Sequence, residues 1–358
     1  MTLSDLAYKA RIAIQVGGAF FVAIVLVYAV IAFVFMQVGN KTPEVEPQNL
    51  NIAFANVPPV SIEQALDLDG ARYTYLLNTI DNDYPVTTSA AEVFFVPTKN
   101  VTLSYTKQAD AIAQEFGFDT DAVRPKRLNE GEILYEDANK RLDVDIRNFN
   151  YTFSLKSSPS LQELVEATPS ADVVSLEDSW KSMAQNIFLQ SQGGNDVLSG
   201  ASTNVVYVSY DLSKGTYTPI DDETQPQAVR IDFFKKDDLL PIVSPYFFTS
   251  QNYVILAPLT SDATVVQAQI KTYPKLLEGA GRYPLITAEE AWKQLESHKA
   301  KVVSIADNPE LPIKINNIYV AYYDPESYQQ YYQPVFVFLG SDNFVAYLPA
   351  IKLQYLLK

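Results

Sequence analysis

The chain has 358 residues, a formal net charge of −15 and no cysteine. It is too long for one ordinary domain, and its hydrophobic content of 47% is enough to build sizeable cores. The acidic balance argues against a nucleic-acid partner, because phosphate contacts need a basic patch. The absence of cysteine excludes a disulfide framework and favours a bacterial or archaeal surface for an extracytoplasmic domain.

The first element along the chain is a long apolar run. No charged residue lies between Arg11 and Lys41, and residues 12–38 are long enough to cross a bilayer as one transmembrane helix. Lys9 and Arg11 precede the run, so the positive-inside rule places residues 1–11 in the cytoplasm. A cleaved signal peptide would have an apolar region of about 7–15 residues and a small-residue cleavage site. The sequence therefore predicts a single-pass membrane protein with a large extracytoplasmic C-terminal domain.

Small residues near the start of this run predict a contact between membrane helices. Gly17, Gly18 and Ala19 would let a second helix approach closely. The candidate partners in the membrane are another envelope protein and a second copy of the chain, which would form a homo-oligomer through the transmembrane helix. Residues 39–60 are polar and proline-bearing, which predicts a linker between the membrane and the rest of the chain.

Residues 61–160 are predicted to form a first α+β module. Its helix is indicated by four apolar residues that share one face, namely Ala109, Ile112, Ala113 and Phe116. Leu142, Val144 and Ile146 then alternate with charged residues, as in a half-buried strand. After Asn148 the apolar residues occupy odd-numbered instead of even-numbered positions, which predicts a turn or bulge near residues 147–148.

Residues 175–259 and 287–350 resemble two copies of one unit. The two tryptophans of the chain, Trp180 and Trp292, fall in register within a helical pattern at the start of each copy. Three later segments follow in the same order, pairing residues 204–211 with 317–324, 227–229 with 333–335, and 252–254 with 343–345. An internal repeat of this kind predicts tandem modules, with residues 161–280 as the second α+β module and residues 281–358 as the third.

The helix of the third module is well marked. Thr287 and Glu290 form a capping-box pattern, and Ala288, Ala291, Trp292 and Leu295 share one face. Strand-like segments follow each helix. The predicted fold class is therefore α+β, with a single N-terminal transmembrane helix followed by an ectodomain of tandem helix-plus-antiparallel-sheet modules.

The sequence predicts no enzyme, no cofactor and no metal site. His298 is the sole histidine, and cysteine is absent, which excludes the usual zinc sites and Ser-His or Cys-His systems. Residues 104–107 fit S-x-x-K and residues 341–343 fit S-D-N, but the K-T-G motif of penicillin-recognising enzymes is missing. Acidic groups such as residues 221–223 and 237–238 lack the spacing of an EF-hand loop, and charged loop faces explain them.

A group of tyrosines is the candidate binding surface. It consists of Tyr322, Tyr323, Tyr328, Tyr331 and Tyr332. Tyrosine offers a large contact area with a polar tip and is enriched at interfaces. Half of these rings are expected in the core or on a sheet, and the other half are expected to form a peptide-binding or glycan-binding surface.

Short phrases of the last module carry a family resemblance. Residues 291–292, 320–323 and 333–338, together with the anchor and the first helix-then-strands module, resemble extracytoplasmic YycH/YycI-type regulatory proteins with PepSY-like units. The resemblance implies a non-enzymatic regulatory protein of the cell envelope that restrains a membrane sensor kinase. The alternative is a cell-wall or glycan-binding surface protein that uses exposed tyrosines.

Overall fold

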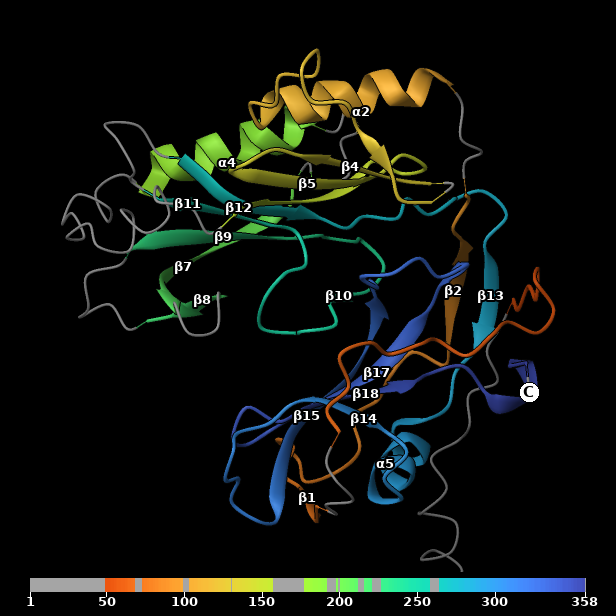
Figure 1. Ribbon diagram of the computed structural model, residues 1–358. Coiled ribbons are helices and arrows are strands. Elements are labelled where there is room, and N and C mark those ends of the chain that lie inside the picture. Colours follow the sequence, from red (N-terminus) through yellow and green to blue (C-terminus); the bar gives the residue numbers. More distant parts are fainter. Residues whose placement is uncertain are drawn as a thin grey trace, which may run out of the picture. The chain divides into compact units, whose positions relative to one another are not determined.

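The computed structural model describes residues 49–67, 73–98, 103–129, 131–156, 177–191, 198, 200–211, 216–220, 227–257 and 264–357. These residues form eighteen β-strands in three sheets, three α-helices and one short 3-10 helix, η2 (Leu353–Tyr355) (Figure 1). The described part of the chain is therefore mostly β. The predicted fold class, tandem helix-plus-sheet modules behind a transmembrane helix, is wrong.

The predicted membrane anchor also needs correction. Within the described ranges, no helix is both long enough and apolar enough to cross a membrane. The predicted span, residues 12–38, and the predicted helix contact at Gly17, Gly18 and Ala19 lie outside the described residues. The structure thus gives no support to a single-pass membrane protein.

The largest sheet has nine strands in the order β3-β4-β5-β6-β12-β11-β9-β7-β8. Their bounds are β3 (Lys126–Arg127), β4 (Glu132–Glu136), β5 (Lys140–Asp145), β6 (Asn150–Leu155), β7 (Ser202–Asp211), β8 (Thr216–Pro219), β9 (Ala228–Phe234), β11 (Tyr253–Ala257) and β12 (Thr264–Ile270). Helices α2 (Leu103–Glu115) and α4 (Glu177–Ser191) lie side by side on one face of this sheet (Figure 1).

One strand pairing explains why the modules are not separate. Strand β6 pairs antiparallel with β12 from Tyr151↔Ile270 to Ser154↔Gln267. Strands from residues 61–160 and from residues 161–280 therefore belong to one continuous sheet. Unpaired sheet edges invite association with other chains, and joining the two ladders removes two such edges.

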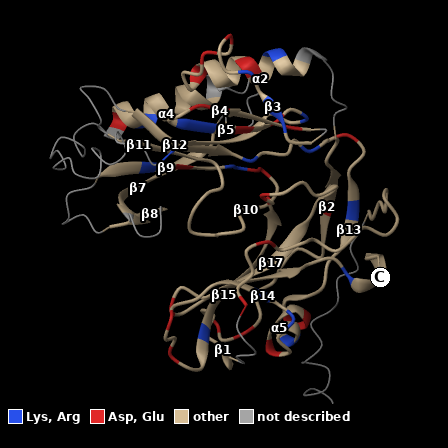
Figure 2. Ribbon diagram, viewed as in Figure 1, with Lys and Arg blue, Asp and Glu red and all other residues tan. Residues whose placement is uncertain are grey.

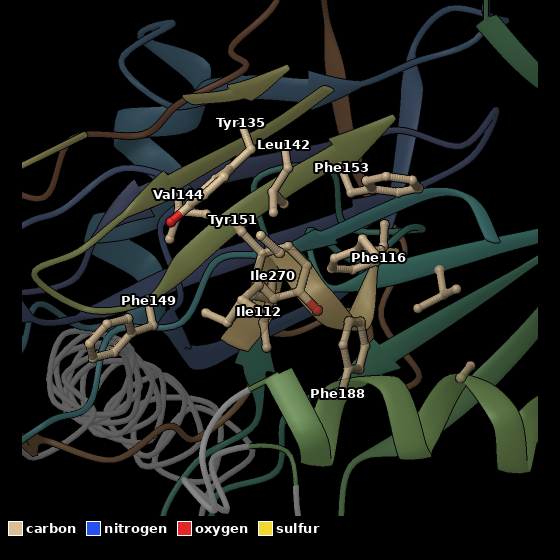
Figure 3. Close-up of a cluster of buried hydrophobic side chains, with 14 of the residues drawn as sticks. Ile112, Phe116, Tyr135, Leu142, Val144, Phe149, Tyr151, Phe153, Phe188 and Ile270 are labelled. Carbon is tan, nitrogen blue, oxygen red and sulfur yellow. The ribbon is translucent and has the colours of Figure 1, made fainter. Parts of the chain in front are cut away.

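Alternating residues build the core between this sheet and its helices. Leu142, Val144 and Ile146 are buried on the helix-facing side, as their spacing predicted. Figure 3 shows aromatic rings filling the same space, with Phe116 directly after α2 and Phe188 on α4. The predicted turn is confirmed, because residues 146–149 form a turn between β5 and β6.

The second sheet has six strands, with the order β1-β15-β17-β18-β14 and β10 as a further partner of β15. Their bounds are β1 (Tyr75–Leu77), β10 (Ile242–Val243), β14 (Lys301–Ser304), β15 (Ile313–Tyr323), β17 (Pro334–Gly340) and β18 (Val345–Pro349). Helix α5 (Ala288–Glu296) packs on one face, and Val60 and Val243 belong to the apolar cluster on the other. This sheet is therefore buried on both sides.

A third, three-stranded sheet has the order β13-β2-β16. Its strands are β2 (Ala90–Phe95), β13 (Gly281–Pro284) and β16 (Tyr331–Tyr332). Residues 49–60, predicted as a linker, contact this part of the fold. Asn51 bridges to Arg282, Val57 bridges to Leu356, and Val57 is fully buried.

The two segments predicted as repeats have the same local strand order. After α4, β7, β9 and β11 are neighbouring antiparallel strands, and after α5, β15, β17 and β18 are as well. The second segment differs in that β14 comes directly after α5 and pairs with β18. Trp180 on α4 and Trp292 on α5 are only 4% and 5% exposed. The capping box at the start of α5 is confirmed, since Thr287 and Glu290 exchange both hydrogen bonds.

Equal burial of the two tryptophans leads to a stability prediction. We expect Trp180→Ala and Trp292→Ala each to lower the free energy of unfolding by about 3–5 kcal/mol, the usual cost of deleting a large buried aromatic side chain. Urea denaturation followed by circular dichroism measures both losses. A loss below about 1 kcal/mol for either variant, the size of an ordinary surface substitution, would contradict equivalent packing.

Candidate functional site

A buried ion pair joins the nine-stranded sheet to the end of β15. Asp324 follows β15 and is 3% exposed. Its Oδ1 accepts a hydrogen bond of 2.8 Å from Lys235 Nζ, and its Oδ2 accepts one of 3.0 Å from Gln251 Nε2. Lys235 follows β9 and Gln251 precedes β11, so both donors flank strands of the nine-stranded sheet. Burial raises the pKa of Asp324, and the Lys235 ammonium opposes that rise.

Breaking this pair should destabilise the protein strongly. Lys235→Met leaves the Asp324 carboxylate buried without a cation, and we expect a loss of about 3–5 kcal/mol at pH 7. The loss should shrink as the pH falls, because a protonated Asp324 needs no cation. The matched control is Lys236→Met, which removes an exposed positive charge one residue away. Urea denaturation measures the free energy of unfolding of both variants. Equal losses of free energy would show that the Lys235–Asp324 ion pair does not stabilise the contact between the sheets.

The carboxylate of Glu326 lies two residues beyond this ion pair and is half-buried. Its Oε2 accepts hydrogen bonds from Tyr246 Oη at 3.1 Å and from Gln64 Nε2 at 3.4 Å, and its Oε1 accepts one from Gln269 Nε2 at 3.3 Å. Charge-assisted bonds are usually about 2.7–2.9 Å long. The donors to Glu326 are a phenol and two amides, which carry no charge, and their bonds are longer than this range. They do not compensate the negative charge of the carboxylate.

A second carboxylate adjoins the first. Glu63 accepts hydrogen bonds from the backbone N–H groups of Glu326, at 2.6 Å, and Ser327, at 3.0 Å. The backbone of Glu63 is held in turn, because its N–H donates to Tyr323 Oη at 2.8 Å. Among the ion pairs formed within the described ranges, none includes Glu63 or Glu326. Two carboxylates thus lie together without a lysine or arginine partner in the described part of the chain.

Exposed aromatic rings lie in the two loops, residues 244–252 and 324–330, that carry Tyr246 and Glu326. Tyr246 is 39% exposed, Phe248 is 50% exposed and Tyr328 is 41% exposed. Tyr273 links Tyr328 to the backbone of Glu326, because its ring lies 6.0 Å from that of Tyr328 and its hydroxyl donates to the Glu326 carbonyl oxygen at 3.0 Å. We call Glu63, Glu326, Tyr246, Phe248 and Tyr328 the Glu326 surface.

The Glu326 surface combines negative charge with neutral phenol rings. Burial, assisted by the Glu326 carboxylate, raises the pKa of Tyr246 to about 12, so its hydroxyl stays a hydrogen-bond donor at pH 7. The charge of Arg230, which is paired with Asp232, opposes the rise in the pKa of Tyr246. Figure 2 shows other basic residues on β3, β5 and β13. Aromatic faces and carboxylates both attract cations. The arrangement is therefore suited to an ammonium or guanidinium group.

The raised pKa of Tyr246 gives a pH prediction. A folded-state pKa above the ordinary value of 10.0 means that the contribution of Tyr246 to stability is complete below about pH 10. That contribution is lost as the pH rises through about 12. In Glu326→Gln the carboxylate charge is gone, so the pKa of Tyr246 should fall part of the way toward 10.0.

NMR titration with ring-labelled tyrosine measures this change, and Tyr246→Phe identifies the signal by its disappearance. An identical titration in the wild type and in Glu326→Gln would contradict the contact.

The five predicted tyrosines do not form one surface. Tyr322, Tyr323 and Tyr332 are at most 4% exposed, since Tyr322 and Tyr332 pack in one apolar cluster and Tyr323 in another. Tyr331 is half-buried, with its ring 5.0 Å from that of Phe54. Tyr328 is the most exposed ring and the one that joins the Glu326 surface. Tyr323 contributes indirectly, by accepting the Glu63 N–H.

Sequence reasoning missed Glu63, Glu326, Tyr246 and Phe248. The signal that could have found two of them is the loop sequence at residues 245–248, where three aromatic residues follow a proline between polar stretches. Nothing in the local pattern marks the two glutamates. No group of three or more potential metal ligands occurs within the described residues.

Comparison with known proteins identifies no family. No family model matches the chain, and no curated protein matches it. A solved structure of an uncharacterized protein from Eubacterium rectale is similar over 75% of this chain and 85% of its own length, with 12% sequence identity and a TM-score of 0.37. The resemblance to YycH/YycI-type proteins stays a prediction.

Proposed function

We propose that this protein is a non-enzymatic binding protein that recognises a basic segment of a protein partner through the Glu326 surface. The observation that carries the proposal is the pair of carboxylates, Glu63 and Glu326, that lack a cation among the described residues, with the exposed Tyr246 bonded to Glu326. Tyrosine and phenylalanine at the centre of a contact supply much of the binding energy of protein interfaces.

The charge of the whole chain supports the same partner. A net charge of −15 attracts basic partners at long range and accelerates their encounter. At the Glu326 surface, a lysine or arginine could replace long hydrogen bonds from neutral donors with short charge-assisted ones. The buried contacts around Asp324 fix the backbone that carries Glu326, so little ordering is needed on binding.

Binding to peptides tests the proposal directly. The full chain is applied to an array of lysine-containing and arginine-containing peptides and to the same peptides with acetylated lysines. We expect binding to the unacetylated peptides that weakens as salt rises. The double variant Glu63→Gln, Glu326→Gln should weaken this binding by about tenfold or more, equivalent to about 1.4 kcal/mol.

The control variant is Glu115→Gln, Glu296→Gln, which removes the same two charges at exposed helix positions. Equal weakening in both double variants would mean that net charge alone attracts the peptides. A different result would favour a glycan-binding protein and contradict the proposal. In that result the wild type binds no peptide but retains cell-wall polysaccharide, and Tyr328→Ala does not retain it.

A further inference from the structure

Lys275 is held among three aromatic rings and a carboxylate. Its Nζ lies 4.1 Å from the ring centre of Phe94, 5.0 Å from that of Tyr322 and 5.3 Å from that of Tyr332. It also forms an ion pair with Asp237. We call these four partners the aromatic cage.

The cage is built from parts of the chain that do not depend on Lys275. Phe94 is on β2, Tyr322 on β15 and Tyr332 on β16, while Asp237 lies in the loop after β9. Phe94 and Tyr332 are paired residues of neighbouring strands, and the ring of Tyr322 lies 5.7 Å from Phe94 and 5.2 Å from Tyr332. Asp237 is oriented separately, because its Oδ1 accepts the Leu239 N–H at 2.9 Å.

The chemistry of the cage selects an organic ammonium group. The faces of aromatic rings carry negative electrostatic potential, and a cation within about 6 Å of several faces is attracted to each of them. The rings are nearly free of solvent, with Phe94 and Tyr322 both 1% exposed and Tyr332 4% exposed. The Asp237 carboxylate adds the single negative charge that a monovalent cation requires.

Lys275 lies next to the exposed part of a connecting segment. Residues 271–280, the crossover segment, run from β12 to β13 without regular secondary structure. Next to Lys275, Leu276 is 46% exposed and Leu277 is 70% exposed. The backbone is attached there by Leu276 N–H, which donates to Phe95 O at 2.9 Å. Thr272 and Tyr273 anchor the start of the segment, because the Thr272 N–H donates to Asn150 Oδ1 and the Tyr273 hydroxyl to Glu326 O. The exposed residues 276–279 can open locally without unfolding the sheets.

We propose that Phe94, Tyr322, Tyr332 and Asp237 form a binding site for an organic ammonium group, which Lys275 occupies as an exchangeable intramolecular ligand. The site is separate from the Glu326 surface and does not rest on the function proposed for it. Binding of an external ammonium group to the cage would release residues 274–279 of the crossover segment and expose its leucines further.

Chemical rescue of Lys275→Ala in the full chain tests the cage. The substitution removes the three outer carbons and the ammonium of the side chain, which propylammonium replaces. We expect propylammonium chloride to raise the melting temperature of Lys275→Ala, with 1-butanol as the neutral control giving no rise. Adding Asp237→Asn should weaken propylammonium binding by about tenfold or more.

Hydrogen exchange of the wild type tests whether Lys275 is exchangeable. A tethered ligand acts at an effective concentration on the order of millimolar, so the competitor must exceed that range. We expect propylammonium chloride to accelerate exchange at the Leu276 N–H, compared with sodium chloride at the same ionic strength.

Three outcomes would overturn the proposal. The first is no rescue of Lys275→Ala, or equal rescue by 1-butanol, since the cage would then not recognise an ammonium group. The second is rescue without any change of exchange in the wild type, which would make Lys275 a fixed structural residue. If Lys275→Ala does not fold, refolding with propylammonium chloride should recover it, and failure of that recovery also overturns the proposal.

Discussion

A carboxylate buried between two sheets needs a cation and hydrogen-bond donors, and Asp324 obtains both from the sheet to which it does not belong. Lys235 and Gln251 reach it from the ends of β9 and β11. Gln251 also donates to Pro325 O at 3.1 Å, so the chain just beyond β15 is held at two successive residues. Because a buried charge without partners is costly, the two sheets can separate only by also breaking this set of bonds.

Residues at and just beyond the end of β15 contribute to both proposed sites. Tyr322 faces the Lys275 ammonium, Asp324 joins the sheets, and Glu326 carries the unpaired carboxylate. Tyr323 lies between them on the opposite face of its sheet, and its hydroxyl accepts the Glu63 N–H. Residues 322–326 therefore contact the buried ammonium of Lys275 at one end and carry the Glu326 carboxylate at the other.

Local patterns in the sequence predicted local structure well. The alternation at Leu142, Val144 and Ile146 indicated one buried face, and the capping pattern at Thr287 marked the start of α5. Periodicity reports which face of a segment is buried, but not which strand lies beside it. The pairing of β6 with β12 joins residues more than a hundred positions apart, so the sequence suggested separate modules where one sheet exists.

The tyrosines show the same limit at the level of the site. Tyr322 and Tyr323 are consecutive, and a strand with one solvent-facing side would expose one of them. Both are buried because the six-stranded sheet is covered on both faces. Glu63 and Glu326 meet only through the tertiary fold, and no spacing rule relates two residues so far apart in sequence.

The central claim is that Asp324 and its partners make the two sheets one cooperative unit, and the two tryptophans allow a direct measurement. Trp180 belongs to the core of the nine-stranded sheet and Trp292 to that of the six-stranded sheet. In Trp180→Phe and Trp292→Phe, the remaining indole reports on one sheet alone. Urea unfolding of each variant, followed by tryptophan fluorescence and by circular dichroism, should give coincident transitions within that variant. A fluorescence transition that is separated from the circular dichroism transition of the same variant would contradict the account.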